Sequence, residues 1–209
     1  SMVEPFRYRN KAEFPCVMSK DGRIMAGFYA GRTHAIIECE DCLLGVEENR
    51  VILDLVLEYM KEYHISPYEE LTVKGLVRHV MIRKGFATGE VMVCLIVNGD
   101  SLPHVDALVE RLRTIQGMAS ITLNINREQT NVLMGREIKL LWGQQYIEDT
   151  IGSVRFRISP LSFYQVNPLQ TEKLYNKALG YAGLTGEETV WALYCGIGTI
   201  TLFLAQRAT

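Results

Sequence analysis

The chain has 209 residues, of which 48% are hydrophobic and 22% are charged, the composition of an ordinary globular protein. Its net charge of −2 excludes a protein that is basic throughout, and no apolar stretch of about 18 residues is present to cross a membrane. The five cysteines have no disulfide-rich spacing, which favours a reducing, cytoplasmic compartment.

Hydrophobic periodicity predicts strands interleaved with helices along most of the chain. Strands are expected over residues 9–18, 23–30, 33–39, 73–84, 90–97, 121–126, 131–133, 139–142, 146–151 and 154–158. Helices are expected over residues 47–63, 104–115 and 169–182, where apolar side chains recur at helical spacing. Residues 3–159 are therefore expected to form an α+β domain that ends before Pro160.

The stretch around residue 195 carries the first functional signal. Residues 190–194 are an apolar run typical of a buried strand, Cys-Gly-Ile-Gly at 195–198 is a tight turn, and a helix-like run begins at Thr199. This order matches the first unit of a doubly wound nucleotide-binding sheet. The third glycine of the dinucleotide pattern is missing, which favours a single-nucleoside cofactor such as S-adenosylmethionine over NAD or FAD. A tight turn without any ligand is the alternative.

One such unit cannot make a parallel sheet alone, because each further strand needs its own crossover. The predicted fold class is therefore α/β: an α+β central domain, followed over residues 160–209 by the truncated start of a Rossmann-like domain. The strand over 190–194 would have unpaired edges, so it is expected to be poorly ordered or paired with another chain.

The segment Ser-Phe-Tyr-Gln-Val-Asn-Pro at 162–168 carries the second signal. An aromatic pair and an amide suit a planar heterocycle, because the ring can stack and Gln165 offers both a donor and an acceptor. Asn167 followed by Pro168 is also a typical helix start. Capping leaves Phe163 and Gln165 unexplained, so both interpretations can hold.

Three segments together resemble the S-adenosylmethionine-dependent RNA uracil-5 methyltransferases, which make 5-methyluridine in ribosomal or transfer RNA. They are Y-R-N-K-A-E-F-P at 8–15, S-F-Y-Q-V-N at 162–167 and L-Y-C-G-I-G-T at 193–199. Among subgroups, the chain is most similar to the bacterial enzymes for 23S ribosomal RNA. The resemblance implies that the catalytic cysteine and general base lie beyond residue 209, so no catalytic residue and no turnover are expected from these residues alone.

The resemblance also assigns site residues. It implies that Gln165 contacts both the cofactor and the target uracil, and that Phe163 shapes the base pocket. Tyr194 and Gly196 would line the S-adenosylmethionine site. Ala192 stands where the family usually has an aspartate, and its presence is expected to weaken cofactor binding.

Two further groups of residues are open to two interpretations. Cys39 and Cys42 form a lone C-x-x-C, which fits two ordinary thiols at a strand end. The resemblance instead offers Cys42 as the fourth ligand of a 4Fe–4S cluster in a longer protein. Arg7, Arg9 and Lys11 lie near Phe6 and Tyr8, and basic residues mixed with aromatic ones suit single-stranded RNA or a solvated strand edge.

The function implied by the resemblance is methyl transfer from S-adenosylmethionine to carbon 5 of a uridine in 23S ribosomal RNA, with transfer RNA as the other candidate substrate. RNA would be the partner, with no membrane involved. Two alternatives remain at this point: a non-catalytic RNA-binding module, and a small-molecule methyltransferase with an N-terminal substrate domain.

Overall fold

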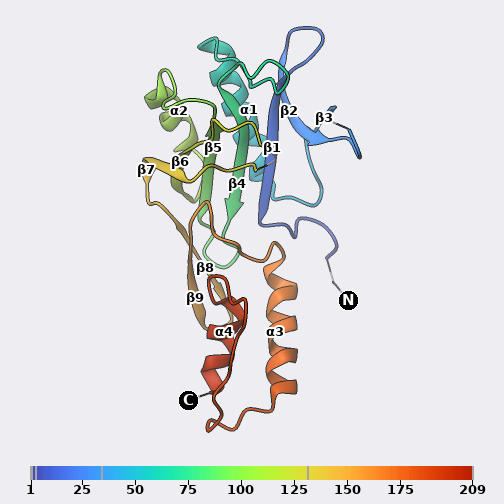
Figure 1. Ribbon diagram of the computed structural model, residues 1–209, viewed down its shortest axis with the longest axis vertical. Helices are drawn as coiled ribbons and strands as arrows, with labels where there is room; N and C mark the ends of the chain where they lie inside the picture. Colours follow the sequence, from blue (N-terminus) through green and yellow to red (C-terminus); the bar gives the residue numbers. More distant parts are fainter. Residues whose placement is uncertain (1, 3, 34, 131, 209) are drawn as a thin grey trace.

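The computed structural model describes residues 2, 4–33, 35–130 and 132–208, and in these residues seven strands form one mixed sheet (Figure 1). The strands are β1 (Lys11–Met18), β2 (Ile24–Tyr29), β3 (Ile36–Glu38), β4 (Val77–Lys84), β5 (Val91–Val97), β6 (Met118–Ile125) and β7 (Glu137–Gly143). Their order across the sheet is β3-β2-β1-β4-β5-β6-β7. Only the β5–β6 pair is parallel among these described neighbours.

Two helices cover one face of the sheet. They are α1 (Glu48–Glu62) and α2 (Val105–Leu112), and α2 lies in the crossover between the parallel strands. Strand side chains alternate between the two faces. In β4, Val80 and Ile82 pack toward the helices, whereas Met81 belongs to a second apolar cluster on the opposite face. All seven residues of β5 are buried, as its unbroken apolar sequence predicts for a strand covered on both sides.

The second cluster joins the sheet to the C-terminal elements. These are the hairpin β8 (Ile147–Ile151) and β9 (Val154–Ile158), α3 (Pro168–Ala182), α4 (Thr199–Leu204) and a short 3₁₀ turn (Ala205–Arg207). In Figure 1 the hairpin, α3 and α4 extend below the lower end of the sheet. The buried members of the cluster are Met81, Met92, Cys94, Ile96, Ile147, Ile151, Phe156, Ile158, Tyr164, Tyr175 and Phe203.

The expected α/β fold class is confirmed, with helices and most strands where periodicity predicted them. The strand expected over 131–133 is an exception. Asn131 lies outside the described residues, and Val132 and Leu133 form no strand. Their carbonyls instead accept hydrogen bonds from the Asn126 side-chain amide, at 2.8 and 2.9 Å.

The strand expected over 190–194 is also wrong. These residues form no strand, and the side chains of Trp191, Leu193 and Tyr194 are exposed. A strand needs a neighbour whose backbone groups complete its hydrogen bonds, and the described part of the chain provides none here. No helix in the described ranges is long and apolar enough to cross a bilayer.

Candidate functional site

Arg83, near the end of β4, holds the start of the Ser162–Pro168 segment. Its Nη1 donates to the carbonyl of Ser159 at 3.1 Å, and its Nη2 donates to the carbonyl of Ser162 at 3.0 Å. The side chain is only 1% exposed, and burial lowers its pKa to about 10. The two serine hydroxyls lie 2.9 Å apart, which tightens the same turn.

Asn10, just before β1, holds the middle of the segment. Its Nδ2 donates to the carbonyl of Gln165 at 3.0 Å, and its backbone N–H donates to the carbonyl of Val166 at 2.9 Å. The Asn10 carbonyl accepts from the backbone N–H of Lys84 at 2.9 Å. The segments 8–15 and 162–168, over 150 residues apart in sequence, are therefore in direct contact.

Tyr164 anchors the segment from within. Its ring is buried 5.9 Å from that of Phe156, and its hydroxyl donates to Oδ2 of the fully buried Asp149 at 3.4 Å. Oδ1 of Asp149 accepts from the backbone N–H of Ala87 at 2.9 Å. Burial, followed by the charge of Asp149, raises the pKa of Tyr164, so this hydroxyl serves as a structural donor.

The side chains on either side of Tyr164 remain available to contact a ligand. The Phe163 side chain is 70% exposed, and Gln165 is half-buried. The Gln165 side-chain amide makes no hydrogen bond to any described residue. Asn167 caps α3 by accepting from the backbone N–H of Gln170 at 3.1 Å, and Pro168 is the first helical residue. The predicted cap is therefore confirmed, and it leaves Phe163 and Gln165 free for a ligand.

The predicted turn before α4 contains three residues with left-handed backbone. Gly196 and Gly198 have φ of +57° and +79°, and Tyr194 has φ of +60°. A Cβ at Gly196 would meet no atom within 4 Å, so the conformation rather than packing favours glycine there. Tyr194 and Gly196 are exposed, which leaves the turn open to a ligand.

Contacts between α3 and α4 fix the end of this turn. The hydroxyls of Tyr175 and Thr199 lie 2.8 Å apart, and the ring centroids of Tyr175 and Phe203 are 5.7 Å apart. Ala192, at the position where the resemblance implies an aspartate, supplies no polar side chain to the turn.

The predicted basic residues differ in their surroundings. Arg9 is exposed, whereas Lys11 forms an ion pair with Glu13 at 2.6 Å. The sequence patterns assign no role to Asn10 between them, and they place Arg83 on a possible basic face, whereas the structure buries it. The available signal was a charged side chain in an otherwise apolar stretch of strand. Arg83 follows Met81 by two residues and so lies on the same face of β4, whereas Ile82 between them faces the helices.

Half of the aligned residues are identical to those of a protein described as an RNA methyltransferase. The relative, described as an uncharacterized RNA methyltransferase of Halalkalibacterium halodurans, is 50% identical over 208 residues, which make up 99% of this chain and 45% of the relative. A similarly described protein of Clostridium tetani is 45% identical over the same shares. The chain thus spans less than half the length of these curated relatives. No protein-family model matches it.

A solved structure resembles the whole chain. It is the crystal structure of Pyrococcus abyssi tRNA (uracil-54, C5)-methyltransferase in complex with S-adenosyl-L-homocysteine. The TM-score is 0.81 and the identity is 26%, over 98% of this chain and 48% of that one. The chain therefore has the fold of part of a methyltransferase structure.

The C-x-x-C residues do not form a metal site by themselves. Arg7 forms an ion pair with Asp41 at 2.6 Å and donates to the carbonyls of Cys42 and Gly45, which fixes the loop. Burial raises the pKa of Cys39, as does its neighbour Cys42. Within the described ranges, no group of three or more His, Cys, Asp or Glu side chains is placed to hold a metal ion. The residues present therefore do not fit a 4Fe–4S cluster without ligands from elsewhere.

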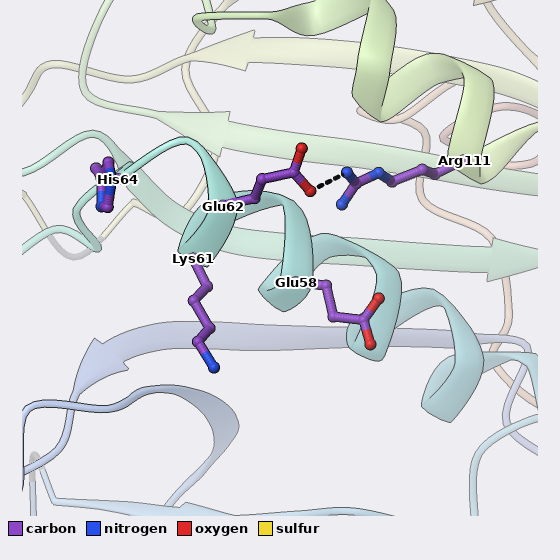
Figure 2. A pocket seen from close by; sticks show the side chains of 5 residues that line it. All are labelled: Glu58, Lys61, Glu62, His64 and Arg111. Atoms are coloured by element: carbon purple, nitrogen blue, oxygen red, sulfur yellow. Dashed lines mark hydrogen bonds and ion pairs between the residues drawn. The ribbon is translucent and has the colours of Figure 1, made fainter.

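A hollow of about 490 Å³ lies on the helical face of the sheet, beside the end of α1. It is lined by Glu58, Lys61, Glu62, His64 and Arg111. Figure 2 shows Arg111 paired with Glu62, while the other side chains point in different directions. The Ser162–Pro168 segment packs on the opposite face through Tyr164. This open, charged hollow therefore does not belong to the candidate site.

Proposed function

We propose that this chain is part of an S-adenosylmethionine-dependent RNA methyltransferase that methylates carbon 5 of a uridine. The observation that carries the proposal is the structural likeness to a uracil-C5 methyltransferase over 98% of the chain. Similarity to proteins described as RNA methyltransferases supports the same activity. We propose 23S ribosomal RNA as the substrate and the cytoplasm as the location, on the motif resemblance. The solved neighbour acts on transfer RNA, which is the competing substrate.

In this proposal, residues 3–159 are the RNA-binding domain and residues 160–209 begin the methyltransferase domain. Gln165, Tyr194 and Gly196 would hold S-adenosylmethionine, which supplies the methyl group when bound. The unbonded Gln165 amide and the open left-handed turn at Gly196 fit that role.

The chemistry assigned to this chain is recognition of the base. A uridine must leave its stack to reach an enzyme's pocket, and an exposed aromatic ring with a free amide can receive it. Phe163 would stack on the uracil, and the Gln165 amide would bond its edge. Arg9 and Lys11 would contact the RNA backbone. Methyl transfer to carbon 5 needs a thiolate that first adds to carbon 6. By the resemblance, that cysteine lies in the part of the relatives that this chain does not match.

Two measurements test the proposal. Fluorescence anisotropy with a short labelled RNA should detect salt-dependent binding that is tighter for a uridine-containing strand than for the same strand with cytidine. Phe163→Ala should weaken uridine binding about tenfold, the scale of one lost base stack, whereas Leu161→Ala, at another exposed apolar side chain, should not.

The second measurement is methyl transfer from S-adenosylmethionine to 23S ribosomal and transfer RNA transcripts, followed by mass spectrometry of the nucleosides. We expect no 5-methyluridine from these 209 residues. Turnover would contradict the assignment of the nucleophile to another part of the protein. Absence of any uridine preference would contradict the base-recognition role.

A further inference from the structure

We propose that Arg83 and Asn10 are positioning residues that fix the backbone of the Ser162–Pro168 segment in the shape that receives the uracil, an inference that rests on the proposed function. Neither residue reaches the ligand in this assignment. Both act through the carbonyls that they hold.

The two residues fix four carbonyls within eight consecutive residues. Arg83 binds the carbonyls of Ser159 and Ser162, and Asn10 binds those of Gln165 and Val166. The two contacts are adjacent, because Asn10 immediately precedes β1, and β1 is the neighbour of β4, which carries Arg83. Lys11 pairs with Arg83 in the β1–β4 register, so the residue before it lies directly beside the end of β4.

The hydrogen bonds from Arg83 and Asn10 involve none of the side chains proposed to face the ligand. Every hydrogen bond from Arg83 and Asn10 to the segment goes to backbone, and Tyr164 points inward to Asp149. Phe163 and the Gln165 amide therefore project from a backbone fixed on both sides of them. Preorganisation of this kind lowers the conformational entropy that a site must lose when it binds.

The choice of a buried arginine as hydrogen-bond donor indicates that the Ser162–Pro168 segment needs a fixed geometry. Arg83 is 1% exposed and forms no ion pair with a described residue. A buried cation with no carboxylate in direct contact is a costly way to hold a loop, because its lost hydration is offset mainly by neutral acceptors, with a smaller contribution from the charge of Glu13. A planar guanidinium can, however, bind two carbonyls in a defined relative orientation, which a lysine cannot.

The same strand offers a matched control. Arg78 in β4 is also buried, at 6% exposure, and its guanidinium also donates to two backbone carbonyls, those of Asn126 and Glu128 at 2.9 and 2.8 Å. Those carbonyls belong to the loop after β6, not to the Ser162–Pro168 segment. Arg78→Met therefore removes an equivalent buried arginine without touching the proposed site.

The experiment compares Arg83→Met, Arg83→Lys, Asn10→Ala and Arg78→Met in the full 209-residue chain. Amide hydrogen exchange reports the mobility of residues 163–167, and anisotropy measures binding of the uridine RNA and of its cytidine counterpart. Arg83→Met should speed exchange of these amides about tenfold and reduce the preference for uridine. Asn10→Ala should do the same around Gln165, and Arg83→Lys should fall between Arg83→Met and the parent chain. Arg78→Met should speed exchange only in the loop after β6.

The outcomes distinguish failure of the positioning role from failure of the proposed function. A merely structural role would lower binding of both RNAs equally and leave the uridine preference intact, which would overturn the positioning role while the proposed function stands. If the parent chain binds no RNA, the proposed function fails and the positioning role fails with it. If Arg83→Met does not fold, Asn10→Ala decides: faster exchange at 163–167 with unchanged uridine preference overturns the inference.

Discussion

His79 in β4 illustrates how the surroundings of one side chain make stability depend on pH. Its ring lies 6.4 Å from that of Tyr29, and its Nδ1 is buried without a hydrogen-bond partner among the described residues. Burial, together with the neighbouring cation of Arg78, lowers the pKa of His79 to about 4. In the unfolded chain this pKa is about 6.5. Between these values the unfolded state binds more protons, so stability is complete above about pH 6.5 and falls as the pH drops toward 4.

We therefore predict that lowering the pH from about 7 to about 5 costs up to about 2 kcal/mol through His79 alone. Urea unfolding at both pH values, in the parent chain and in His79→Gln, measures this cost as the difference between their pH dependences. His64→Asn, at an exposed histidine, is the control and should keep the parent's dependence. An identical pH dependence in His79→Gln and the parent would contradict the prediction.

The residues proposed to face a ligand can be selected from sequence more easily than the residues proposed to position them. Phe163 and Gln165 stand out because a helix cap does not explain an aromatic ring and an amide beside it. Arg83 and Asn10 do not stand out, because their role depends on which strands are neighbours. The contact between residues 10 and 165 is set by the β1–β4 register and by the path of the chain after β9. No local pattern encodes either.

At the scale of elements, α3 follows local chemistry closely. Asn167 accepts from the backbone N–H of Gln170 at 3.1 Å, and Pro168 begins the helix. We predict that Asn167→Ala lowers the free energy of unfolding by about 1 kcal/mol, because one helical N–H loses its acceptor. Asn176→Ala, an exposed position within the same helix, should be neutral or slightly stabilising. Urea unfolding of both variants checks this, and equal effects would exclude a specific cap.

The apolar run at 190–194 marks the limit of prediction at this scale. Such a run indicates a strand only where a neighbouring strand can pair with it, and no described element does so. The glycine turn that follows was predictable, since the left-handed conformations at Gly196 and Gly198 are local properties of the chain.

At the scale of the whole molecule, the sheet and the C-terminal elements share one apolar cluster. Met81 and Met92 from the sheet contact the same buried group as Tyr164 and Tyr175, which follow Pro160 in the sequence. Arg83 in the sheet likewise depends on the carbonyls of Ser159 and Ser162. An RNA-binding module that ended at residue 159 would therefore expose part of its own core.

We predict that a chain ending at residue 159 loses several kcal/mol of stability, since each large apolar side chain removed from the cluster contributes about 1.5–3 kcal/mol. A chain ending at Gly183 keeps α3, Tyr175 and both carbonyls that Arg83 binds, so it should lose much less. Urea unfolding and amide exchange in β4 compare the two with the parent chain. If the shorter chain were as stable as the parent and still bound RNA with the same salt dependence, the cluster would be dispensable. That result would favour a self-sufficient RNA-binding domain over residues 3–159.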